Sequence, residues 1–155
     1  MEDIVLLDDN LENSSLKLVD ASKGKRLANY LIDLIATMIL GFVLGFGLYA
    51  LGIIGDDVIA FMDDPLGSRA TGALLIILYY AVFEGLVKGK TIGKMITKTR
   101  AVNLDGTQPE FGTIMKRTIS RIVPFEVFSF LGSRPTGWHD RWSDTIVIDE
   151  KQSSL

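Results

Sequence analysis

The chain is organised around the stretch from Lys23 to Ile54, which begins Lys-Gly-Lys-Arg-Leu-Ala-Asn-Tyr-Leu-Ile-Asp and continues as a nearly unbroken apolar run. An apolar segment longer than about 18 residues is typical of a transmembrane helix. This one carries Arg26 at its start and Asp33 inside it. With a rise of about 1.5 Å per residue, Asp33 is expected roughly 10 Å deeper than Arg26. The helical period predicts one polar face, made of Arg26, Asn29, Tyr30, Asp33 and Thr37.

The residues on either side of this span predict its orientation. Residues 1–22 form an acidic leader, whereas Lys23, Lys25 and Arg26 cluster where the apolar run begins. Basic residues flank the cytoplasmic ends of membrane spans, so we expect the N-terminus in the cytoplasm. The leader lacks the basic, apolar and small-residue pattern of a removable signal peptide, and the first span is expected to serve as its own signal.

A second apolar run, Ala70 to Val87, is just long enough to span and carries Glu84 near its end. The connector before it, residues 55–69, is acidic, which suits the non-cytoplasmic side. Basic residues follow it, which predicts a return of the chain to the cytoplasm; they are Lys88, Lys90, Lys94, Lys98 and Arg100.

The segment Gly89 to Lys94 reads Gly-Lys-Thr-Ile-Gly-Lys and invites comparison with a phosphate-binding loop. Such a loop needs a glycine five positions before Gly89, where this chain has Glu84 inside an apolar helix. No strand precedes it either. We therefore expect a basic, glycine-punctuated turn at the membrane surface and no nucleotide binding.

Two short strands and an amphipathic helix are predicted in the second half of the chain. Residues 97–104 and 145–149 are rich in β-branched residues and are expected to pair as a cytoplasmic two-stranded element. Between them, residues 111–131 have one apolar and one basic face, with a break at Pro124. Each half is too short to span, which favours an interfacial or re-entrant helix kinked at Pro124; a kinked third span is the alternative.

Composition excludes several classes of function. The 155 residues contain no cysteine and a single histidine, His139, which leaves no disulfide, thiolate nucleophile or His-cluster metal site. A net charge of −3 without a basic arm gives no reason to expect nucleic acid binding. His139 has no nucleophile or metal partner at a diagnostic spacing, so we expect no enzyme activity and no cofactor.

The buried charges are expected to meet near the cytoplasmic surface. Asp33 and Glu84 lie at similar depth in antiparallel spans, and two carboxylates there need cations or protons. The candidate cations are Arg26, Arg117 and Arg121. Such a cluster fits two interpretations: ion pairs that fasten the interfacial helix to the spans, or a site for a cation or proton.

These residues also resemble a known family. Arg26 and Asp33 in the first span, Glu84 before Gly89 to Lys94, Asp105-Gly106, the Arg117 and Arg121 pair, and His139-Asp140 before the terminal strand are similar to the RDD family of bacterial membrane proteins. That family is named for one arginine and two aspartates. The resemblance covers about residues 23–148 and implies that these are Arg26, Asp33 and Asp140.

The resemblance implies a small, mainly helical bacterial inner-membrane protein that crosses the bilayer more than once and is suspected of transport, with a few members linked to sodium–proton exchange. The leading hypothesis is transport of a small cation or proton-coupled solute through the cluster of Arg26, Asp33, Glu84, Arg117, Arg121 and Asp140. The alternative is an accessory or scaffold subunit that binds a partner protein. Two spans enclose little protein, so transport would need a homo-oligomer, for which Gly41 and Gly45 offer a close helix contact. The expected organisation is an acidic leader (1–22), a membrane domain (23–149) and a tail (150–155).

Overall fold

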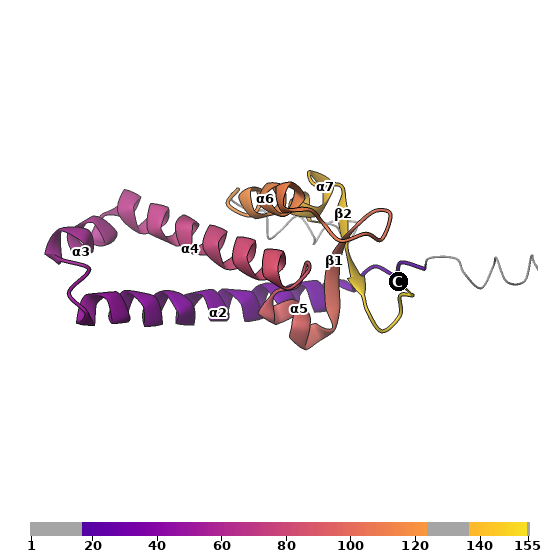
Figure 1. The fold of residues 1–155 in the computed structure, drawn as a ribbon, viewed down its shortest axis with the longest axis horizontal. Coiled ribbons are helices and arrows are strands. Elements are labelled where there is room, and N and C mark those ends of the chain that lie inside the picture. Colours follow the sequence, from indigo (N-terminus) through magenta and orange to yellow (C-terminus); the bar gives the residue numbers. More distant parts are fainter. Residues whose placement is uncertain (1–16, 124–136, 155) are drawn as a thin grey trace, which may run out of the picture.

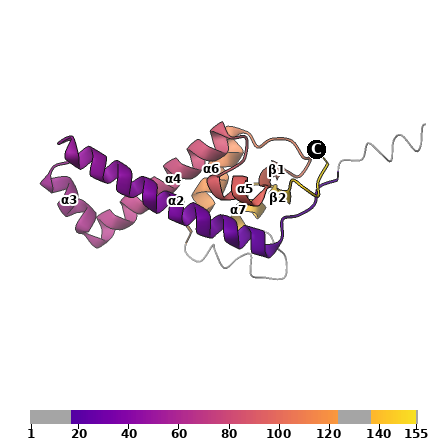
Figure 2. The same cartoon turned by 90° about the horizontal axis from the view of Figure 1, so that it is seen from below.

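The computed structural model describes residues 17–123 and 137–154. Two long antiparallel helices extend from a base that holds the sheet and three short helices, and a fourth short helix connects the two long ones at their far end (Figure 1). The helices cross instead of lying parallel, as the perpendicular view shows (Figure 2). In chain order the elements are α2 (Lys23–Ala50), α3 (Asp56–Asp63), α4 (Pro65–Leu86), α5 (Ile92–Thr97), β1 (Thr99–Asn103), α6 (Phe111–Ser120), α7 (Trp138–Arg141) and β2 (Thr145–Asp149).

Helices α2 and α4 are the two described helices long and apolar enough to cross a membrane. Only 11% of the apolar window of α2 and 17% of that of α4 is buried within the molecule. A core helix of a soluble protein is instead covered by its own chain, because burial of its apolar faces is what holds it in place. The exposed apolar surface of these two helices is therefore left for another environment.

The turn between the two long helices differs in detail from the sequence prediction. Residues 55–69 were expected to form a connector, but they contain α3, and α4 begins at Pro65 instead of Ala70. Proline suits the first helical position, and the Asp64 side chain caps the helix by accepting from Leu66 N at 2.9 Å. A Cβ on Gly67 would lie 1.7 Å from the Phe61 carbonyl oxygen, so only glycine allows this close packing.

The base is a small antiparallel sheet with helices around it. Strand β1 pairs with β2 in the register Thr99 with Asp149 and Asn103 with Thr145, which confirms the predicted two-stranded element. Residues 17–21 run along the other edge of β2, where Ala21 N donates to Val147 O and Asp149 N donates to Val19 O, each at 2.8 Å. The end of the leader thus belongs to the base.

The segment from Gly89 to Lys94 is a turn that leads into α5, a helix that the sequence did not predict. Gly89 has a φ of +83°, and a Cβ there would lie 2.4 Å from the Ala101 carbonyl oxygen. Thr91 caps α5 by accepting from Lys94 N at 3.3 Å. A Cβ on Gly93 would lie 2.6 Å from the Asn29 carbonyl oxygen, so glycine is what lets α5 lie directly on α2.

Helix α6 is amphipathic, as predicted, and packs against α4 and α7 at the base (Figure 1). Its ten residues extend about 15 Å, half of the hydrocarbon thickness, so α6 alone is too short to span. The predicted kink at Pro124 and the apolar piece that follows it lie outside the described residues.

Candidate functional site

The buried interior of the base is dominated by charged and polar side chains. Arg117, Glu84 and Asp140 are completely buried, beside only a few apolar residues such as Tyr79 and Ile148. A buried charge is stable only when it is paired and hydrogen-bonded. The partners of these groups therefore decide what the site can do.

Glu84, in the last turn of α4, faces three cations. Its Oε1 accepts from Lys94 Nζ at 2.7 Å and from Arg121 Nη2 at 3.0 Å, and its Oε2 accepts from Arg117 Nε at 3.1 Å. Burial lowers the pKa of Lys94 to about 8, and the charges of Arg117 and Arg121 add to this, while Glu84 opposes it. The Lys94 ammonium faces the Glu84 carboxylate directly, and α4, α5 and α6 are joined at this one carboxylate.

Asp140, on α7, links α7 to α6 and to the start of α2. Its Oδ1 accepts from Arg117 Nη1 at 2.8 Å, and its Oδ2 accepts from Arg26 at the start of α2. Burial by itself raises the pKa of the Asp140 carboxyl, but the facing His139, Arg117 and Arg26 outweigh burial and hold this pKa well below its usual range. Arg117 thus connects Asp140 directly to Glu84.

Arg26 also fastens the sheet. Its Nε donates to the Ala21 carbonyl oxygen and its Nη2 to the Val147 carbonyl oxygen, both at 3.2 Å. A planar guanidinium supplies several donors in fixed directions, which suits one side chain to several acceptors. Arg26 consequently ties α2 to β2 and to the strand-like residues 17–21.

Asp33 lies beside this network and is held differently. Its Oδ1 accepts from the Tyr79 hydroxyl at 2.7 Å and from Gly93 N at 2.8 Å, and its Oδ2 accepts from the Thr91 hydroxyl at 2.7 Å. In the parts of the chain that the structure describes, none of the ion pairs involves Asp33. Its three partners are neutral donors from α4 and from the start of α5.

The structure thus brings five of the six candidate residues, Arg26, Glu84, Arg117, Arg121 and Asp140, into one ion-pair network and places Asp33 next to it. Sequence reasoning missed Lys94, Thr91 and Tyr79. A signal for the first two was present, because Gly89 to Lys94 directly follows the helix that carries Glu84. The basic turn is what supplies Lys94 to Glu84 and Thr91 to Asp33.

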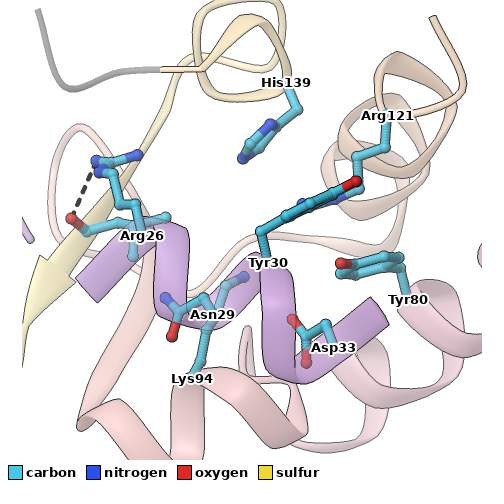
Figure 3. A pocket seen from close by; sticks show the side chains of 9 residues that line it. Arg26, Asn29, Tyr30, Asp33, Tyr80, Lys94, Arg121 and His139 are labelled. Carbon is cyan, nitrogen blue, oxygen red and sulfur yellow. Dashed lines mark hydrogen bonds between the residues drawn. The ribbon is translucent and has the colours of Figure 1, made fainter. Parts of the chain in front are cut away.

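A small cavity of about 30 Å³ lies between α2 and the surrounding elements (Figure 3). That volume has room for about two water molecules, since a single water needs about 10–15 Å³. Asp33 lines the cavity on α2, while Glu84 and Asp140 are not among its lining residues. Those are Arg26, Asn29, Tyr30, Asp33, Tyr80, Lys94, Arg121, His139 and Val147.

The fold and the site define a class of small helical proteins. In this class two exposed apolar helices extend from a base whose elements are held together by buried ion pairs. The RDD family model matches residues 21–144, which is most of the chain. The chain belongs to the RDD family, as its motifs indicated. Comparison with curated proteins and with solved structures gives no significant match. The family is membrane-associated, so membership supports a membrane protein and assigns no activity to it.

Proposed function

We propose that this protein is an accessory or scaffold subunit of the bacterial inner membrane, in which the charge cluster is structural and holds the helices and the sheet of the base together. The observation that carries this proposal is the saturation of the carboxylates. Glu84 has three cationic partners, Asp140 has an arginine on each oxygen, and Asp33 accepts three hydrogen bonds. Carboxylates that already have such partners gain little from binding a further cation, whereas removing one partner costs several kcal/mol.

The charge distribution supports insertion with both described ends of the chain in the cytoplasm. Basic residues gather at the base, and the opposite end, around α3, carries Asp56, Asp57, Asp63 and Asp64. Basic residues are retained on the cytoplasmic side, so α2 and α4 would cross the bilayer from the base outward.

This orientation is testable because the chain has no native cysteine. Asp57 and Lys151 are exposed, at the α3 end and beyond β2 respectively. We expect Asp57→Cys to react with an impermeant thiol reagent in intact cells, and Lys151→Cys to react only after lysis. Labelling of Lys151→Cys in intact cells contradicts the proposed topology.

The role of the cluster is tested by pairing abundance with ion flux. Asp33→Asn and Glu84→Gln are expected to lower the amount of folded protein in the membrane, because both remove contacts that hold the base together. The recovery of any partner should fall in proportion to the amount of folded protein. Proteoliposomes that hold equal amounts of wild-type and variant protein should show the same proton movement under sodium or potassium gradients.

A second candidate function, binding of a proton or small cation, is favoured by the surroundings of Asp33. Its described partners are neutral, and it lines a cavity with room for water. Arg26, Lys94 and Arg121 line the same cavity, and their positive charges oppose the binding of a further cation there, which places this function second to the structural one. Gradient-driven proton movement that Asp33→Asn abolishes without changing the melting temperature would establish this function and overturn the structural one.

Oligomerisation remains part of the proposal. A Cβ on Gly41 would lie 2.9 Å from Leu75 of α4, so Gly41 serves packing within the chain. A Cβ on Gly45 would have nothing within 4 Å, which leaves that position of α2 open to another helix.

A further inference from the structure

Helix α6 has its polar side chains turned inward and its apolar side chains turned outward. Arg117 and Thr118 are completely buried in the base. On the opposite side of the helix, Phe111 is 67% exposed and Ile119 is 56% exposed. A helix on a water-facing surface has the reverse arrangement, with its apolar side chains against the protein and its polar ones in solvent. The outer face of α6 is therefore suited to an apolar environment.

The apolar side chains on the outer side of α6 form one continuous stripe. Phe111, Met115 and Ile119 recur at a spacing of four residues, which places them one above the other on the helix. Ile122 follows in the turn after α6 and is also exposed. Within the described residues 111–123, Lys116 is the one exposed side chain with a charge, and the helical period places it at the edge of the stripe. A lysine in that position can extend its ammonium away from an apolar surface.

The end of the stripe lies beside the apolar part of the two long helices. The guanidinium of Arg121 is 4.1 Å from the centre of the Tyr80 ring, and Tyr80 lies roughly 9 Å before the end of α4 at Leu86. Ile122 lines the same groove as Leu34 of α2. Figure 1 shows α6 alongside the last turns of α4, against which it packs. The outer face of α6 thus continues the exposed apolar surface of α2 and α4.

We infer that the outer face of α6 contacts the lipid of the cytoplasmic leaflet, so that this side of the base is immersed in the bilayer. The inference rests on the membrane insertion and orientation proposed above. Lipid around α2 and α4 continues onto α6 without a polar boundary, because Ile122 joins the stripe to the surface of the long helices. A stripe of large apolar side chains with a lysine at its edge has the composition of a surface at the boundary between acyl chains and headgroups.

This placement differs from that of a helix that lies on the membrane surface. Such a helix keeps its basic face in water. In α6 the basic face instead holds Glu84 and Asp140 through Arg117. With lipid on its outer side, α6 separates these ion pairs from water, and charges attract one another more strongly where water is excluded.

Spin labels can distinguish lipid, water and protein at this face, because the chain has no native cysteine. Two variants, Phe111→Cys and Ile119→Cys, each place one label on the stripe of the full-length protein in liposomes of phosphatidylglycerol and phosphatidylethanolamine. Ile39→Cys, at an exposed position within α2, is the control for lipid, and Lys151→Cys, beyond β2, is the control for water. Oxygen concentrates in hydrocarbon and a nickel chelate stays in water, so the collisions of the label with each reagent, measured by electron paramagnetic resonance, identify its surroundings.

We expect both labels on the stripe to collide more often with oxygen than with the nickel chelate, as Ile39→Cys does, and Lys151→Cys to show the reverse order. Frequent collisions with the nickel chelate at the stripe overturn the inference, because they place the stripe in water. Rare collisions with both reagents also overturn it, because they show that protein covers the stripe, such as a second copy or a partner. Either result, with Ile39→Cys in lipid, leaves the proposed membrane insertion intact. Absence of Ile39→Cys from lipid overturns that insertion and this inference together.

Discussion

Replacing Glu84 with glutamine tests most directly whether the ion pairs hold the protein together. The substitution preserves shape and removes the charge, which leaves Lys94, Arg117 and Arg121 around a neutral amide in a fully buried place. Removing one partner of a buried ion pair typically costs about 3–5 kcal/mol. For a chain of this size, such a loss lowers the melting temperature by roughly 6–20 °C.

The assay can use the protein's own fluorescence. The chain has two tryptophans, Trp138 and Trp142, and both belong to α7 or its C-cap, on either side of Asp140. Because Asp140 connects to Glu84 through Arg117, release of the network changes the surroundings of these rings. Their emission during heating of the detergent-purified protein therefore reports the melting of the base.

Two further variants make this prediction specific. Glu110→Gln removes a charge from an exposed glutamate and is expected to change the free energy of unfolding by less than about 0.5 kcal/mol. Adding Lys94→Met to Glu84→Gln removes one stranded cation and should recover part of the loss, so the double variant should be less than additive. A melting temperature for Glu84→Gln equal to that of Glu110→Gln would refute the reasoning.

Three other predictions concern the contacts around this network. Gly93→Ala should destabilise the protein by about 1–3 kcal/mol, because the added Cβ would meet the backbone of α2. The control Gly112→Ala should not destabilise it, because the added Cβ would have nothing within 4 Å. Equal melting temperatures for the two variants would contradict the close approach of α5 to α2. Thr91→Val should cost about 1–3 kcal/mol through the loss of the α5 cap and of the bond to Asp33, also read from the melting temperature. The pKa of Asp140 is lower in the folded protein than in the unfolded chain, where it is about 4. The Asp140 carboxylate therefore stabilises the fold at pH values above about 4, and this stabilisation is lost progressively as the pH falls below that value. Melting temperatures at pH 7 down to pH 3 should fall more steeply for wild type than for Asp140→Asn, which starts lower, and parallel curves would exclude this role of Asp140.

The long elements were predictable from local composition. The apolar runs identified α2 and α4, and β-branched residues identified both strands, because hydropathy and strand preference are local properties. The family resemblance identified Asp140, which no local pattern would have singled out among several acidic residues near the C-terminus.

The arrangement within the site depended on contacts that no local pattern contains. The glycines and the threonine in the basic segment indicated a turn. The contact between α5 and α2 that Gly93 allows is a tertiary contact, which a local pattern does not show. The sequence likewise suggested cations for Asp33, since it showed a buried acid without showing the Tyr79 and Thr91 hydroxyls that face it. Lys94 was assigned to the membrane surface because basic residues there are usually solvated.

The pairing of Arg26 with Asp140 has a consequence for how the protein is made. The two residues are separated by 114 positions, and Lys17 pairs with Ser154 over 137. At about 5–20 residues per second, α2 leaves the ribosome on the order of ten seconds before the partner of its arginine exists. During that interval Arg26 has none of its β2 contacts, and the base cannot close until synthesis is nearly complete. A chain that terminates before Asp140 therefore presents α2 and α4 on a base whose arginines lack their carboxylate partner.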